Sequence, residues 1–125
     1  MRNGFWGLIF VFGLVSCAKE TEPSGDLNGT YNGTFLRTGD VEDAGSVRIV
    51  FVADIFSGET TASDLNICYG NYDIFGDSIN FKNLCSGSDL LKGNYKFKES
   101  ADSLYFSRVV DSTVHYTDNF ILKKQ

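Results

Sequence analysis

Residues 67–86 read ICYGNYDIFGDSINFKNLCS, and this stretch predicts the fold of the chain. Gly76 and Asp77 form a Gly-X pair, which is typical of the two-residue turn of a β-hairpin. With that turn at the tip, Cys68 and Cys85 lie at equal distances from it and face each other across two strands. Counted out from the turn they form a non-hydrogen-bonded pair with Cα atoms about 4.5 Å apart, which is within disulfide range.

The hairpin alternates apolar and polar residues, as expected for an antiparallel sheet with one solvated face. Its expected inner face contains Cys68, Tyr72, Ile74, Ile79, Phe81 and Cys85. Further strands are expected over residues 27–36, 47–53, 55–61, 91–98, 103–107 and 114–124, and a polar, acidic loop over 37–45. No window has a convincing helical period. About eight short strands joined by short turns predict an all-β fold, an antiparallel meander barrel.

Two details of the strands can also be predicted. Phe120 and Leu122 are expected to point inward near the end of the chain, and pairing Phe97 with Leu104 would give another apolar face. Near the start, Gly33 falls on the inner face of its strand, where a missing side chain leaves room for a neighbour or a bend.

Composition limits the possible partners. The chain has 125 residues, with 16 acidic against 11 basic side chains and a net charge of −5. This length suits a single domain. The acidic balance argues against nucleic acid, which requires clustered positive charge. The 11 Phe and 6 Tyr favour strands over helices.

The N-terminus has the features of an export signal. An apolar run over residues 5–15 follows Arg2 and is too short to span a membrane. It ends in LVSC at 14–17, which resembles the bacterial lipobox. That resemblance implies a signal peptide over 1–16, a lipidated Cys17, a flexible tether over 17–26 and a barrel domain over 27–125. The alternatives are an ordinary signal peptide or a membrane anchor that contains a cysteine.

Localisation follows from the same resemblance. Ala18 stands after the cysteine where an Asp would favour the inner membrane, so the outer membrane is expected, with the Cys17 lipid as the contact with the bilayer. The sequence KETE at 19–22 resembles the export tag of some Bacteroidota lipoproteins. With Cys17 lipidated, Cys68 and Cys85 remain as a pair in a compartment where disulfides form. Two buried free thiols are the alternative.

Two family resemblances cover most of residues 27–125. The motif LxGxY at 27–31 and the FILKK ending at 120–124 resemble small lipocalin-like bacterial lipoproteins, with Tyr31 in place of the usual Trp. The motif CYGxY at 68–72, followed by IxFxxxC at 79–85, resembles META-type domains. Both resemblances imply a small antiparallel barrel and leave the activity open.

No catalytic or metal-binding constellation is predicted. His115 is the only histidine, and a Ser-His-Asp or Cys-His device would have to use it. Asp40, Glu42 and Asp43 could hold calcium, but an acidic solvated loop is the better interpretation. No carboxylate occupies an obvious inward strand position. We therefore expect no enzyme activity, no metal and no cofactor.

The aromatic residues of the inner face leave three functions open. They could line a cavity for a slender apolar ligand, or they could fill the barrel, which we favour for a domain of this size. Alternatively, the barrel could present loops to another envelope protein. The residues concerned are Tyr31, Phe35, Tyr72, Phe81, Tyr95, Phe97 and Phe106.

Overall fold

The computed structural model describes residues 27–125. The predictions for the signal peptide, Cys17 and the tether lie outside the described residues. Within residues 27–125, no helix is long and apolar enough to cross a membrane.

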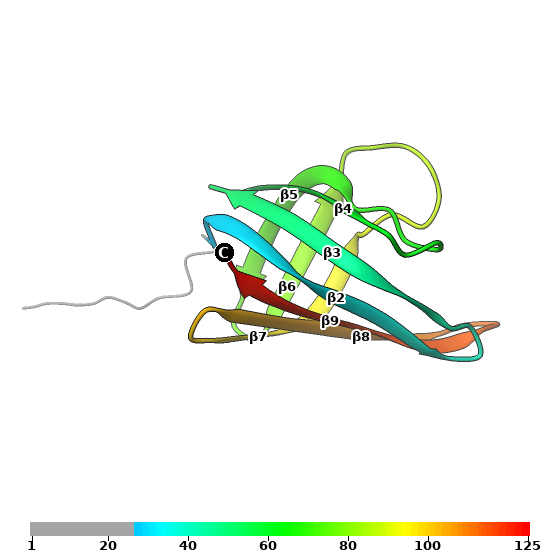
Figure 1. Ribbon diagram of the computed structural model, residues 1–125. Coiled ribbons are helices and arrows are strands. Elements are labelled where there is room, and N and C mark those ends of the chain that lie inside the picture. Colours follow the sequence, from blue (N-terminus) through cyan, green and yellow to red (C-terminus); the bar gives the residue numbers. More distant parts are fainter. Residues whose placement is uncertain (1–26) are drawn as a thin grey trace, which may run out of the picture.

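Eight antiparallel strands form a closed barrel in which each strand pairs with the next along the chain (Figure 1). The last strand pairs with the first, so the sheet closes. The strands are β2 (Gly29–Gly39), β3 (Asp43–Val52), β4 (Ile55–Thr60), β5 (Cys68–Phe75), β6 (Ser78–Asn83), β7 (Gly93–Ser100), β8 (Ser103–Asp111) and β9 (His115–Lys124). The predicted all-β meander barrel is confirmed.

The barrel has two different ends (Figure 1). The near end contains Leu27 and the short turns 53–54, 76–77 and 101–102. The far end contains the turns 40–42 and 112–114 and the longer loops 61–67 and 84–92. The chain therefore enters the barrel and leaves it at the same end.

The central hairpin has the predicted register. Tyr72 pairs with Phe81 and Ile74 with Ile79. Gly76, at the first turn position, has φ of 58°, a conformation that glycine adopts without steric cost. Tyr72, Ile79 and Phe81 are at most 2% exposed, so the predicted inner face is the buried one.

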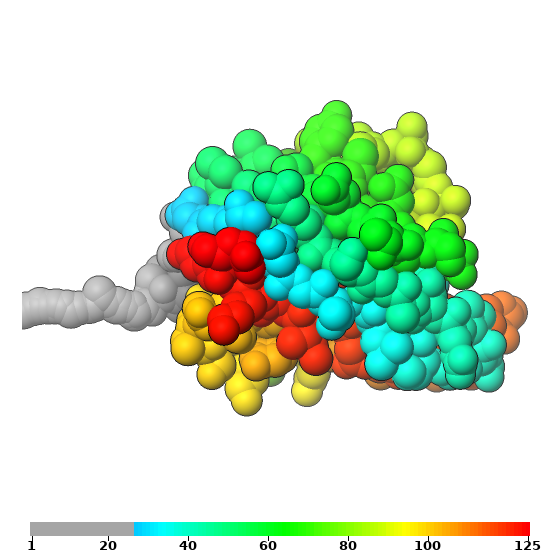
Figure 2. All heavy atoms as spheres, viewed as in Figure 1, coloured from blue at the N-terminus to red at the C-terminus, as the bar shows by residue number. Residues whose placement is uncertain are grey.

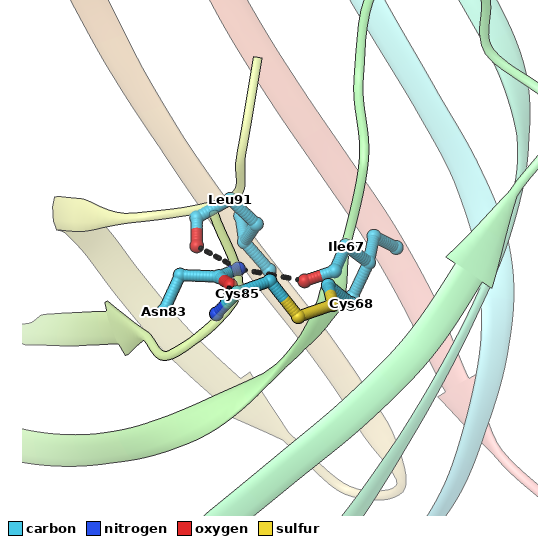
Figure 3. The surroundings of a disulfide bond; sticks show 5 residues. All are labelled: Ile67, Cys68, Asn83, Cys85 and Leu91. Carbon is cyan, nitrogen blue, oxygen red and sulfur yellow. Dashed lines mark hydrogen bonds between the residues drawn. A yellow bond between two sulfur atoms is a disulfide. The ribbon is translucent and has the colours of Figure 1, made fainter. Parts of the chain in front are cut away.

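The disulfide between Cys68 and Cys85 is confirmed, but its predicted geometry is wrong (Figure 3). The regular pairing ends at Gly70 with Asn83, and the Cα atoms of the two cysteines are 6.4 Å apart. The side-chain oxygen of Asn83 accepts a hydrogen bond from the Cys85 backbone N–H at 3.0 Å. This contact turns the chain out of the ladder, so both cysteines are only half-buried at the far end.

The Asn83 side chain also joins two loops (Figure 3). Its Nδ2 donates to the carbonyl oxygens of Ile67, at 2.7 Å, and Leu91, at 3.0 Å. Ile67 and Leu91 are fully buried, so their side chains belong to the hydrophobic core at the far end. The disulfide and the Asn83 amide thus hold the 61–67 and 84–92 loops together.

Two further predictions are wrong. The polar stretch 37–45 is not a loop, since β2 extends to Gly39 and β3 begins at Asp43; its polar residues alternate as strand residues do. In the β7–β8 pair, Phe97 faces Phe106 rather than Leu104. The strands are longer than predicted because Ala101 adopts φ of 55° and closes a turn of only two residues.

Glycine permits the closure between β2 and β9. A Cβ on Gly33 would overlap the Ile121 backbone carbonyl and lie 2.7 Å from the Cα of Leu122. The predicted space beside this inward glycine is therefore taken by the neighbouring strand. On the surface, the cyan atoms of β2 and the red atoms of β9 lie side by side (Figure 2).

Candidate functional site

Aromatic side chains occupy the interior of the barrel. Of the seven residues predicted to line or fill it, six are at most 2% exposed and Phe97 is partly buried. The ring centroids of Phe106 and Phe120 are 4.5 Å apart in a stacked arrangement, and those of Phe35 and Phe120 are 4.9 Å apart. These are distances of direct ring contact. The rings therefore pack against one another.

At the near end, two tyrosine hydroxyls fix the start of the barrel. The Tyr72 hydroxyl accepts a hydrogen bond from the backbone N–H of Leu27 at 2.9 Å and donates to the carbonyl of Ala53 at 2.7 Å. The Tyr31 hydroxyl donates to the Leu27 carbonyl at 3.3 Å. Leu27 is buried at this end, so the two hydroxyls hold the first described residue against the barrel.

At the far end, three charged side chains lie inside the barrel wall. Arg37 donates from Nε and Nη2 to the two carboxylate oxygens of Asp118, at 2.7 and 3.0 Å. The Nε of Arg108 lies 3.6 Å from Oδ2 of the same carboxylate. Asp118 is fully buried and Arg37 is 6% exposed. We call Arg37, Arg108 and Asp118 the charged cluster.

Aromatic rings surround the charged cluster. The Arg37 guanidinium carbon lies 4.2 Å from the Tyr116 ring centroid, and that of Arg108 lies 4.8 Å from the Tyr95 centroid. Two buried polar atoms here have no hydrogen-bond partner, the Tyr95 hydroxyl and the Arg108 Nε. A buried donor without an acceptor costs about 1–3 kcal/mol. The far end therefore has hydrogen-bonding capacity that the protein itself does not use.

Sequence reasoning missed this cluster, and the expectation that no carboxylate points inward is wrong. Asp118 shares a face with Phe120 and Leu122, which were predicted to point inward, and Arg37 shares one with Phe35. Extending the two-residue period by one step would have placed both charges inside. Their pairing could not be read from the sequence, because 81 positions separate them.

The cluster and its surroundings shift several pKa values. The hydrogen bonds that Arg37 donates to Asp118 raise the pKa of Arg37, so the guanidinium stays charged. Burial raises the pKa of Tyr95 above its ordinary value; the positive charge of Arg108 opposes that rise and the negative charge of Asp118 adds to it. Burial also raises the pKa of Tyr31, with further contributions from Glu99 and Asp102.

We expect the free energy of unfolding to fall as pH rises above about 10. In the unfolded chain Tyr31 and Tyr95 release their protons near that pH, whereas the folded protein keeps them to a higher pH. The two tyrosines therefore make their full contribution to the free energy of unfolding below about pH 10. That contribution is lost as the pH rises further and the folded protein also releases the two protons. Urea unfolding between pH 8.5 and 11.5 measures the loss, which should be smaller in Tyr95→Phe. Tyr105→Phe, on the outer face, is the matched control, and an equal reduction in both variants would contradict the assignment.

The other predicted candidates lie apart from the cluster. His115 is exposed next to Asp111, to which its Nδ1 is paired. Asp40 accepts a hydrogen bond from the His115 backbone N–H at 3.0 Å. Asp43 accepts hydrogen bonds from Ala44, Ser63 and Asp64. Across residues 27–125, no group of three or more His, Cys, Asp or Glu side chains is placed to hold a metal ion.

A further surface feature is a groove of about 400 Å³ on the outer face of β7, β8 and β9. Tyr105 and Ile121 are exposed large side chains in this groove. Lys96, Lys98 and Asp77 also line the groove, so charges of both signs lie beside its exposed apolar side chains.

Comparison with known proteins identifies no relative. No family model, no curated protein and no solved structure matches the chain.

Proposed function

We propose that this protein is a lipid-anchored lipoprotein of the outer membrane whose barrel acts as a non-enzymatic interaction module. The observation that carries the proposal is the ring packing in the interior. Phe81 and Phe106, with centroids 5.4 Å apart, occupy the middle of the barrel, where an apolar ligand would have to lie. The outer surface and the far end then remain as the surfaces through which the barrel acts. Exposed apolar side chains such as Tyr105 and Ile121 fit contact with another envelope protein.

Carriage of a slender apolar ligand, in the manner of the lipocalins that the N-terminal motif resembles, is the second candidate. The aromatic character of the interior favours it. Binding would require Phe81, Phe106 and their neighbours to move apart. Native mass spectrometry of protein purified from its own host distinguishes the two functions. A stoichiometric apolar molecule would support ligand carriage, and bare protein would support the interaction module.

The position of Leu27 supports the proposed anchor. Nine residues lie between Cys17 and Leu27, and the ten Cα-to-Cα steps that join them span at most about 35 Å. In this proposal the near end is the end that is tethered to the membrane, and the far end is the end that can reach farther from it. The charged cluster and the disulfide would then lie on the side open to partners.

The anchor is tested by labelling cells with an alkyne analogue of palmitate. We expect wild-type protein to be labelled and Cys17→Ser to remain unlabelled, because only the thiol of Cys17 can carry the thioether. Two lipid chains already hold a protein durably on a membrane, so the variant should also leave the membrane fraction. The double variant Cys68→Ala/Cys85→Ala is the control and should keep its label. Equal labelling of wild type and Cys17→Ser would refute the anchor.

A further inference from the structure

One edge of β8 has no partner strand at the far end of the barrel. The pairing of β8 with β7 stops at Ser107, which lies opposite Lys96, whereas its pairing with β9 continues to Asp111. Among the strands of residues 27–125, residues 108–111 of β8 therefore have a neighbour on one side only. In Figure 1 the orange hairpin of β8 and β9 extends past the place where β7 begins. We call the unpaired side of residues 108–111 the open edge.

The backbone groups that point to the open edge follow from the β8–β9 register. The ladder is flanked by a hydrogen bond from the Lys124 N–H to the Asp102 carbonyl, at 2.7 Å, and by one from the Ser112 N–H to the Val114 carbonyl, at 3.2 Å. Hydrogen-bonded and non-hydrogen-bonded pairs alternate between antiparallel strands.

Counting inward from either of these bonds gives the same result. Arg108 and Val110 direct their N–H and C=O groups to β9, and Val109 and Asp111 direct theirs to the open edge.

The side chains of the open edge do little to prevent another strand from pairing with it. Val109 is 75% exposed, the largest value among the exposed large apolar side chains of residues 27–125. Residues 108–111 contain neither proline nor lysine, which proteins commonly place on edge strands to block pairing. The Arg108 side chain donates to the Lys92 carbonyl at 3.1 Å, so it is held at the β7 end of the open edge. The two valines are residues that favour strands.

We propose that the open edge pairs with the open edge of a second copy of this chain, antiparallel, with Val109 of each copy opposite Asp111 of the other. This register satisfies every free N–H and C=O group of Val109 and Asp111 in both copies. If Val109 instead lay opposite itself, Asp111 would face a Ser107 that is already paired with β7. Val110 then lies on the two-fold axis, opposite its own copy.

The contact is isologous, so the same residues face one another in both directions and the assembly stops at two copies. Four residues from each copy bury much less than the roughly 1,200 Å² of a stable interface, so the dimer is weak and depends on concentration. The inference goes beyond the proposed function and does not rest on lipidation of Cys17.

Cross-linking tests the two-fold axis. Directly opposite residues of a non-hydrogen-bonded pair have Cα atoms about 4.5 Å apart, which is within disulfide range. The full chain carrying Val110→Cys, purified in a non-ionic detergent with micelles in large excess, should therefore form a disulfide-linked dimer under mild oxidation. Val114→Cys, in the exposed turn at the same end, is the control and should stay monomeric on a non-reducing gel.

Charge substitutions at Val109 test the register, because this side chain lies beside Asp111 of the second copy. Val109→Asp places like charges together and should weaken the wild-type dimer about tenfold, equivalent to 1.4 kcal/mol. Val109→Lys places opposite charges together and should tighten it several-fold. Val52→Asp and Val52→Lys make the same changes in net charge at an exposed site of the near end and should have no effect. Sedimentation equilibrium from micromolar to millimolar protein measures the dimer fraction.

Three results would overturn the proposal. The first is a wild-type protein that stays monomeric over the whole concentration range. The second is equal cross-linking of Val110→Cys and Val114→Cys, which would mean random collision of exposed thiols. The third is a shift of the same sign in Val109→Asp and Val109→Lys, which would exclude Asp111 as the residue opposite Val109. Thermal unfolding of each variant confirms that the barrel is intact.

Discussion

Replacing Asp118 by alanine should destabilise the barrel by about 3–5 kcal/mol, which is the usual cost of leaving a buried charge without its partner. The substitution removes the acceptor of both Arg37 hydrogen bonds and the ion-pair partner of Arg108. Arg37 is 6% exposed and cannot regain solvation without disturbing the wall of the barrel. The midpoint and slope of urea unfolding measure the change.

Two controls separate the buried charge from other effects. Asp73→Ala removes an exposed carboxylate from β5 and should change stability by less than about 0.5 kcal/mol. The double variant Arg37→Met/Asp118→Leu should recover much of the loss, because apolar side chains of similar volume often replace a buried ion pair without cost. Arg108 remains in this variant and, being partly exposed, can be solvated. A loss in Asp118→Ala no larger than that in Asp73→Ala would contradict the role of the pair.

Removing the disulfide with Cys68→Ala/Cys85→Ala should lower the free energy of unfolding by about 3 kcal/mol. The two cysteines are 17 positions apart, and the bridge restricts that loop in the unfolded chain. For a domain of this size such a loss lowers Tm by on the order of 10–20 °C. Scanning calorimetry measures it.

The redox state supplies the control for this prediction. Reductant should lower the Tm of wild type towards that of the double variant and leave the double variant unchanged. Asn83→Ala, which keeps the bridge but removes the side-chain bonds to Ile67 and Leu91, should be destabilised without becoming sensitive to reductant. Two reactive thiols in denatured, non-reduced protein would refute the bridge.

Local signals in the sequence predict the strand register correctly where one residue determines the conformation of the turn. Gly76 and the alternation on either side of it predict the β5–β6 register to the residue. The β7–β8 register failed because Ala101 closes a tight turn with a positive φ that alanine rarely adopts. The cysteine geometry failed because Asn83, a side chain with no local signature, redirects the chain.

The charged cluster shows a different limit of sequence reasoning. The polar and acidic residues of 37–45 suggest a loop, whereas Arg37 is a buried residue of β2. Its partner Asp118 lies in the last strand, and only the closure of the barrel brings the two together. A buried ion pair satisfies the hydrogen-bonding groups of both partners once formed, but each partner looks like a surface residue in the sequence.

Pairing between β2 and β9 also determines when this protein can become folded. In this register Tyr31 pairs with Lys124 and Gly39 with Tyr116. One edge of the first strand of the barrel therefore has no hydrogen-bonding partner until the last strand is present. In a chain that is made from its N-terminus, β2 can pair with β3 early, but its other edge stays unpaired until β9 is made. Throughout that interval, the inward faces of Tyr31 and Phe35 and an open strand edge are exposed to other chains. Because this contact is so distant in sequence, closure is expected to be the slow step of folding. A chain that still lacks its C-terminal strand would then be at the greatest risk of pairing with other chains.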